Sequence, residues 1–566
     1  MKRIHRILLS LLIGCSMLYA GTASAETLWE KRRKAYERLK ADPQQDSSSP
    51  IKKKSSSAPT YKPGITYTTG KDDFGIKKVN TFSSSRQFRN PYNITIPTEY
   101  GDITDILYSE GKPLVINIQD YHCNYQAQKQ IAYILEELIV NADLKLIMVE
   151  GNSKDASLKH LRSMAGRERR IEVGEDYLKR GMISGEEYLD IISEYDFKPL
   201  GIEDKDLYMD NLDAFLAIDK FQKDALKIIE DFQLIIRNLK PKVYSKKLLE
   251  IDQKRQQCDE EKISFEIYCN YLLDLAKENN VLLGFSFDNI NRVLKVGKLE
   301  KNINFNQVNR ERDEFIKDLN KKLTDEELAR LLFKVKEFKN NRISANDFHA
   351  YLKQLPKNTS WMGKFPELVE YIDYLAVHDE IEVISLFEEL DKIEDAVKEK
   401  LFKNENERQL SHLDRYADIL YGFYALELIP SQYAYYKSNP ESFKIPEWKA
   451  FLDKLTRKYK LTKHVPQDVS LIVNEKETVD LFYRLAKQRD HVFVKKIKGY
   501  FAQEKTDIGA LITGGFHSAN LAQLVHDAGF SYMTVLPTVT EVTDEELYHS
   551  VLKYKTDLMK KAQTKE

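Results

Sequence analysis

The sequence predicts an α/β protein, with a mostly parallel sheet and flanking helices, split by a large all-helical insertion. Two observations lead to this class. Short apolar segments alternate with amphipathic ones after Asn90 and again near the C-terminus, which is typical of parallel βαβ units. Between them, residues 206–464 contain only 4 Gly and 6 Pro, and this scarcity of helix breakers predicts long helices.

The sequence of the first 25 residues predicts that the protein is exported from the cytoplasm. Three basic residues among the first six precede an uncharged stretch from Ile7 to Ala25, as in a secretory signal peptide. Two interpretations compete: Ala-Ser-Ala at 23–25 fits signal peptidase I, whereas Leu-Ile-Gly-Cys at 12–15 fits a bacterial lipobox with lipidation at Cys15. We therefore expect a periplasmic or extracellular protein that meets a membrane only through such a lipid anchor.

Changes in composition along the chain predict five regions. After the signal peptide comes a helix-prone stretch and then a tether rich in Ser, Lys and Pro, which has almost no apolar residues that could form a core. Charged amphipathic helices then separate two α/β segments. The expected boundaries are 1–25 for the signal peptide, 26–90 for the tether, 91–205 plus 465–545 for a split α/β domain, 206–464 for the helical insertion and 546–566 for a C-terminal helix.

Apolar runs and amphipathic periodicity place the elements of the split domain. Each strand is short and is followed by a helix or a turn. The predicted strands are 113–120, 144–150, 198–203, 510–513 and 532–536, and the predicted helices are 125–140, 476–503 and 518–527.

Overall charge argues against a polyanion as partner. The chain of 566 residues carries 87 Lys+Arg and 88 Asp+Glu, a formal net charge of −1, so it has no electrostatic preference for nucleic acid or anionic lipid. We therefore expect no nucleic-acid partner. The sequence does not identify a substrate.

Ionisable residues lie at or just after the ends of four predicted strands. Asp120 ends the first and His122 comes two positions later, Glu150 ends the second, Glu203 ends the third, and His517 follows the strand at 510–513. Parallel strands bring their carboxyl ends to one edge of a sheet, where ligands bind. Two imidazoles and several carboxylates suit either a divalent metal with an open position or a histidine that takes a proton from water.

These segments resemble one superfamily, formed by the Tiki/TraB proteins, the erythromycin esterase-like proteins and the ChaN-type haem-binding lipoproteins. Gln119-Asp-Tyr-His122 stands at the position of its first Gly-x-x-His or Gly-Glu-x-His motif without the glycine, Met148-Val-Glu-Gly151 at the strand that ends in Glu, and Gly514-Gly-Phe-His517 at the last motif. Lys487-Gln-Arg-Asp-His491 looks like the Glu-Arg-Asp segment of these relatives, with Gln in place of Glu. The resemblance covers roughly residues 110–205 and 475–540.

The resemblance implies an exported hydrolase of peptidase or esterase type. Tiki-like members are metal-dependent proteases, erythromycin esterase-like members use a histidine to activate water, and ChaN-type members bind haem. We therefore expect a hydrolase that uses zinc, manganese or a histidine-activated water. The alternatives are a noncatalytic haem- or metal-binding protein and a secreted helical scaffold.

Each candidate residue has an expected role in such a site. His122 and His517 are expected to hold the metal or activate water, with Glu150 as ligand or base. Asp120 and Glu203 are expected to orient the histidines as hydrogen-bond acceptors. Arg489, from the Glu-Arg-Asp-like segment, is expected to stabilise a developing oxyanion.

Overall fold

The computed structural model describes residues 74–76, 91, 94–514, 518–540, 547 and 550–554, except for gaps at 261, 321, 325–326, 328–330, 332–333, 336–337, 339–344, 357–359 and 382. The predicted signal peptide at 1–25 and the lipidation site at Cys15 lie outside the described residues. So does most of the predicted tether at 26–90 and of the C-terminal helix at 546–566.

The described chain forms two compact units. One unit is Met209–Ala486, and the other contains the described residues up to Tyr208 and from Lys487 onward. The chain passes between them within α6 (Lys205–Asp219) and again within α20 (Lys476–Glu504). All the strands belong to the second unit, which we call the α/β unit, and the described elements of the first, the helical unit, are helices.

The α/β unit contains a six-stranded sheet in the order β1-β6-β2-β5-β3-β4. All neighbouring strands are parallel except β1 and β6, which confirms the prediction of mixed α/β structure with a mostly parallel sheet. The strands are β1 (Gly101–Leu107), β2 (Leu114–Asp120), β3 (Leu146–Val149), β4 (Lys198–Gly201), β5 (Ile508–Gly514) and β6 (Ser531–Pro537).

Strand β5 lies between β2 and β3, so the C-terminal segment completes the middle of the sheet. In this register Asp120 at the end of β2 pairs with Gly514 at the end of β5. The N–H of Glu150, directly after β3, donates to Ile512 O at 3.1 Å. The pairing therefore brings the ends of three strands to one edge.

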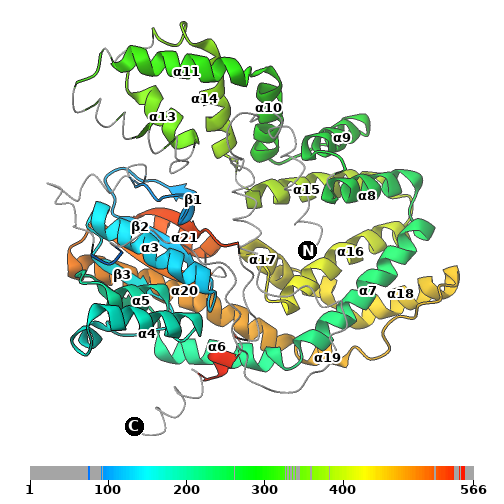
Figure 1. Ribbon diagram of the computed structural model, residues 1–566. Helices are drawn as coiled ribbons and strands as arrows, with labels where there is room; N and C mark the ends of the chain where they lie inside the picture. The colour runs from blue at the N-terminus through cyan, green and yellow to red at the C-terminus, as the bar shows by residue number, and fades with distance from the viewer. Residues whose placement is uncertain are drawn as a thin grey trace, which may run out of the picture. The chain divides into compact units, whose positions relative to one another are not determined.

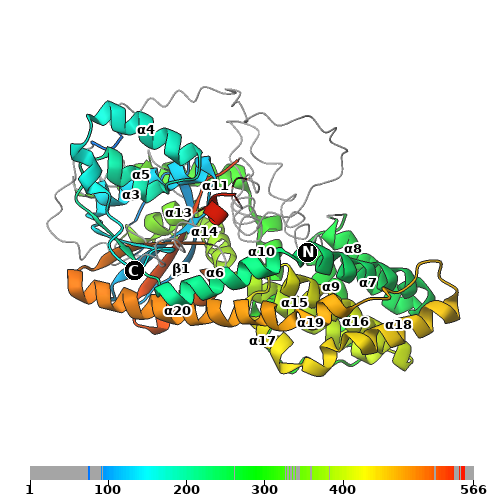
Figure 2. The same cartoon turned by 90° about the horizontal axis from the view of Figure 1, so that it is seen from below.

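Helices cover both faces of this sheet (Figure 2). Ile116 and Ile118 of β2 pack with the buried residues of α3 (Tyr125–Ala142) and α5 (Gly185–Ile192). Val115, which alternates with them, packs on the other face with α20 and α21 (Ser518–Asp527). Because successive side chains of a strand point to opposite faces, continuous apolar strands such as β2 require cover on both sides.

Two further helical segments of the α/β unit contact α5, namely the 3₁₀ helix η4 (Lys159–Ser163) and α4 (Arg167–Lys179). Figure 1 shows one of them, α4, next to α5.

Strand β1 is absent from the sequence prediction. It pairs antiparallel with β6 at the edge of the sheet, and most of its side chains are partly exposed, so it lacks the apolar run of a buried strand. At Gly101 a Cβ atom would lie 2.8 Å from Leu536 O, so only glycine allows the strand to approach this closely.

The helical unit has two hydrophobic cores. The core around Phe265, Phe315 and Phe365 is built from helices α8 to α15, and the core around Phe232 and Trp448 from α7 and α16 to α19 with parts of α6 and α20. Its helices are α7 (Gln222–Val243), α8 (Lys246–Asp259), α9 (Phe265–Glu278), α10 (Asp288–Asn302), α11 (Phe305–Asn320), α13 (Ala345–Gln354), α14 (Pro366–Asp379), α15 (Val383–Leu401), α16 (Glu405–Tyr424), α17 (Pro430–Ser438), η5 (Pro440–Phe443), α18 (Ile445–Tyr459) and α19 (Ser470–Asn474).

In the part of the chain that the structure describes, no helix combines the length and the apolar character needed to span a bilayer.

Candidate functional site

A tight turn after β2 places His122 at the carboxyl edge of the sheet. The N–H of Asn124 donates to Tyr121 O at 3.1 Å, and Cys123 adopts the left-handed conformation with a φ of 57°. The Asn124 side chain then accepts the N–H of Ala127 at 2.9 Å and caps the start of α3. The turn leaves 45% of the His122 side chain exposed to solvent.

His122 pairs with Asp120, as the sequence predicts. Its Nδ1 lies 2.6 Å from Asp120 Oδ2, and the aspartate side chain is only 10% exposed. Since a carboxylate accepts the hydrogen bond, the proton of a neutral His122 belongs on Nδ1. Nε2 then carries the lone pair that a general base needs.

Glu150 shares this edge with His122. Its Oε2 accepts the backbone N–H of Gly514 at 2.7 Å. A Cβ atom built on Gly514 would lie 3.5 Å from His122 Nε2 and 3.6 Å from Glu150 Oε2. The imidazole nitrogen and the carboxylate oxygen therefore flank the same point beside the end of β5.

Arg489 of α20 joins the carboxylates that follow β3 and β4. Its Nη2 lies 2.7 Å from Glu150 Oε1 and 2.5 Å from Glu203 Oε1, and its Nε lies 3.2 Å from Glu203 Oε2. The Arg489 side chain is 7% exposed. Burial by itself lowers the pKa of the guanidinium, but Glu150 and Glu203 more than offset this and hold the pKa above its ordinary value. The sequence does not predict this pairing. It predicts that Arg489 stabilises an oxyanion and that Glu203 accepts a hydrogen bond from a histidine.

Sequence reasoning also missed Tyr208 and Lys496. The Arg489 guanidinium lies over the Tyr208 ring at 5.3 Å, and burial, followed by the charge of Glu150, raises the pKa of Tyr208 to about 12. The Lys496 ammonium donates to Glu203 O at 2.7 Å and to Ser153 O at 3.1 Å. Lys496 follows Arg489 by two helical turns, and this spacing on one helix face is the signal that could have identified it.

His517, the second predicted histidine, lies outside the described residues, as do the two residues before it. Strand β5, which leads to it, ends at Gly514 beside His122 and Glu150.

Two of the three predicted metal ligands, His122 and Glu150, lie at this edge, and the third, His517, lies outside the described residues. Among the described residues no group of three or more His, Cys, Asp and Glu is placed to hold a metal ion. Both oxygens of Glu150 already accept hydrogen bonds, and the cation between Glu150 and Glu203 is the guanidinium of Arg489.

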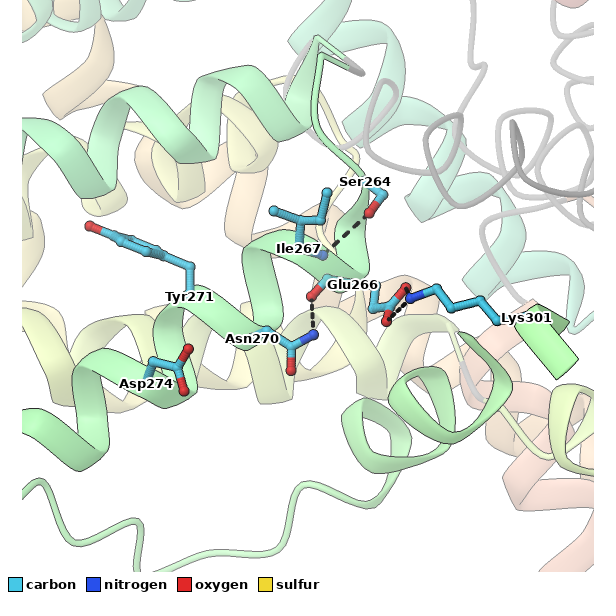
Figure 3. A pocket seen from close by; sticks show the side chains of 7 residues that line it. All are labelled: Ser264, Glu266, Ile267, Asn270, Tyr271, Asp274 and Lys301. Atoms are coloured by element: carbon cyan, nitrogen blue, oxygen red, sulfur yellow. Dashed lines mark hydrogen bonds and ion pairs between the residues drawn. The ribbon is translucent and has the colours of Figure 1, made fainter. Parts of the chain in front are cut away.

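A separate pocket of about 530 Å³ lies on the helical unit (Figure 3). Six of its seven lining residues belong to α9 or its N-cap, and the seventh, Lys301 of α10, lies 3.0 Å from Glu266 Oε1. None of the seven is a sequence-predicted site residue. They are Ser264, Glu266, Ile267, Asn270, Tyr271, Asp274 and Lys301.

Fold and site together define an α/β protein with a His–Asp pair and an arginine-bridged pair of glutamates at the carboxyl edge of a mostly parallel sheet. No family model, no curated protein and no solved structure matches the chain.

Proposed function

We propose that this protein is an exported hydrolase in which His122 activates a water molecule. The observation that carries the proposal is the 2.6 Å contact between His122 Nδ1 and Asp120 Oδ2, because it directs the opposite ring nitrogen toward Gly514 and Glu150. A histidine held by a buried carboxylate is the usual arrangement for a general base.

In the proposed reaction His122 Nε2 takes a proton from water as the water oxygen attacks the electrophilic carbon of the substrate. Asp120 stabilises the resulting imidazolium, and the same ring then returns the proton to the leaving group. Ester or peptide bonds are the substrate class, since their hydrolysis needs this proton transfer.

Glu150 is proposed to orient the attacking water. Arg489 holds one of its oxygens and the Gly514 N–H the other, so the position of the carboxylate is fixed. A water between Glu150 Oε2 and His122 Nε2 would donate one hydrogen bond to each. His517, three positions after Gly514 in the sequence, is proposed as a second histidine of the site.

The remaining parts are proposed from the sequence. Removal of residues 1–25 would release the mature protein outside the cytoplasm, whereas lipidation at Cys15 would anchor it to a membrane. Residues Met209–Ala486 are proposed to be an insertion in the α/β fold, in keeping with the compact unit that they form.

The test uses the full mature chain from Glu26, assayed with chromogenic esters and fluorogenic peptides. We expect His122→Ala and Asp120→Asn to lower kcat/KM by about 10² or more, the usual contribution of a general base. His160→Ala is the matched control, because His160 lies exposed in η4 of the same unit, and it should keep wild-type activity.

Four results would contradict the proposal. Unchanged hydrolysis in His122→Ala would remove His122 as the base. Stoichiometric zinc or manganese, lost together with activity on chelation, would support a metallohydrolase instead. A Soret band in the purified protein would support haem binding, and no hydrolysis or bound group at all would leave a helical scaffold.

A further inference from the structure

We propose that Gln128 is a positioning residue that fixes Asp120, and through it the imidazole of His122. For its catalytic consequence this inference rests on the proposed function. Gln128 lies in the first turn of α3 and is 2% exposed. Its Nε2 donates to Asp120 Oδ1 at 2.6 Å and to Tyr121 O at 3.1 Å.

The other end of the Gln128 amide is held by α5. Gln128 Oε1 accepts the N–H of Gly185, the first residue of α5, at 2.7 Å. This N–H has no partner within its own helix, and it can only donate. The carboxylate of Asp120 can only accept, so a flipped amide would lose both hydrogen bonds.

Gly185 makes the contact between the two helices possible. A Cβ atom at Gly185 would lie 2.3 Å from Gln128 O and 3.0 Å from Ile131 Cβ, which no side chain could tolerate without moving α5 away. The absence of a side chain therefore lets the N-terminus of α5 reach the Gln128 amide.

The result is a continuous series of hydrogen bonds from α5 to the exposed imidazole. Gly185 N–H fixes Gln128, Gln128 holds Asp120 Oδ1, and Asp120 Oδ2 is left for His122 Nδ1. Without the amide, the Asp120 carboxylate could rotate about its last bond and change the oxygen that it offers. At metal sites, loss of the hydrogen-bond partners that orient a ligating histidine costs about 10- to 100-fold in affinity or activity, and we expect an effect of similar kind here.

The test is the tautomer of His122, read from ¹⁵N-histidine NMR of the full mature chain and assigned by loss of its signals in His122→Ala. In the wild type we expect the Nδ1–H form to predominate. Gln128→Met, which keeps the side-chain volume and removes the amide, should lower the ratio of Nδ1–H to Nε2–H at least about threefold. It should also lower kcat about tenfold with little change in KM.

Gln130→Met is the matched control, since it makes the same substitution on α3 at a residue whose Oε1 is buried without a hydrogen bond among the described groups. It should leave the tautomer ratio unchanged. If Gln128→Met does not fold, Gln128→Asn carries the test, because its amide is one methylene too short to reach both Asp120 and Gly185.

A wild-type tautomer ratio in the folded Gln128 variant would overturn the inference, even if hydrolysis is detected. A changed ratio in a protein that hydrolyses no tested ester or peptide would support Gln128 as the positioning residue and contradict the proposed hydrolase. The two proposals can therefore fail separately.

Discussion

The guanidinium of Arg489 lies 2.7 Å from the carboxylate of Glu150, although the two residues are 339 positions apart in the sequence. The same Nη2 is bonded to Glu203, so α20 is joined to the ends of both β3 and β4. Two carboxylates surround one guanidinium in a largely buried setting. This cluster therefore couples the shape of the site to the stability of the sheet edge.

Replacing Arg489 with Met should destabilise the protein by about 3–5 kcal/mol, because it leaves two partly or fully buried carboxylates without their cation. Urea denaturation of the full mature chain measures this loss. Arg169→Met is the control: Arg169 is 64% exposed in an i,i+3 pair with Glu172, and such surface pairs contribute about 0–1 kcal/mol. Equal midpoints for the two variants would show that the buried cluster has no special role in stability.

Much of the sheet follows from apolar runs in the sequence. The prediction of a strand at 113–120 matches β2 (Leu114–Asp120), whose residues are nearly all buried, and the helix predicted at 518–527 has the bounds of α21. The sequence Thr324-Asp-Glu-Glu327 has the form of a capping box, and its hydrogen bonds are present: the Thr324 N–H donates to Glu327 Oε2 at 2.9 Å, and the Glu327 N–H donates to Thr324 Oγ1 at 3.3 Å. Elements whose pattern is set by burial or by local capping can thus be found from sequence alone.

The partners of the site residues could not be predicted in the same way. Strand ends identified Glu150 and Glu203 as candidates, since parallel strands share an edge. That Arg489 would pair with both depends on how α20 packs on the sheet. The role of Gln128 depends on how closely α5 approaches α3, which Gly185 allows. Both the pairing of Arg489 and the role of Gln128 depend on how helices pack, which local sequence patterns do not show.

Gly514→Ala should impair hydrolysis without unfolding the protein. The added methyl group would make ordinary contacts at 3.5 Å from His122 Nε2 and 3.6 Å from Glu150 Oε2, so it is tolerated sterically but occupies the place proposed for water. We expect kcat/KM to fall about tenfold or more, with a thermal midpoint close to that of the wild type.

Gly499→Ala is the control for that substitution, because a Cβ atom there meets nothing within 4 Å. Its activity should equal that of the wild type. Full activity in Gly514→Ala would mean that the water does not lie between His122 and Glu150.

Glu186 makes the stability of the α/β unit depend on pH. Burial, together with the negative charges of Glu187 and Asp120, raises its pKa from 4.5 to about 8. A hydrogen bond from Ser184 acts in the opposite direction and lowers the pKa. Its Oε2 is buried and accepts no hydrogen bond among the described residues. The folded state therefore keeps a proton that the unfolded chain releases above pH 4.5, and stability falls as pH rises from about 4.5 to 8.

Glu186→Gln should remove this loss, because Gln resembles the protonated acid and does not ionise. Relative to the wild type, the variant should gain up to about 4 kcal/mol between pH 5 and pH 9, since about three pKa units of the shift lie in this range at about 1.36 kcal/mol each. Urea denaturation at both pH values measures the difference. Glu172→Gln, at a residue whose side chain is 70% exposed, should show none, and parallel curves for wild type and Glu186→Gln would refute a raised pKa.

Phe74 anchors the segment 74–76 to the α/β unit. Its ring lies 4.6 Å from that of Tyr133 and is 7% exposed, and the next N–H, of Gly75, donates to the buried carboxylate of Glu136 at 2.5 Å. Phe74→Ala should therefore cost about 3 kcal/mol or more in urea denaturation, as for other buried Phe residues. Ile76→Ala is the control within the same segment, because Ile76 is 48% exposed and should change stability by less than about 0.5 kcal/mol. If both variants unfold at the same urea concentration as the wild type, the segment adds nothing to the fold.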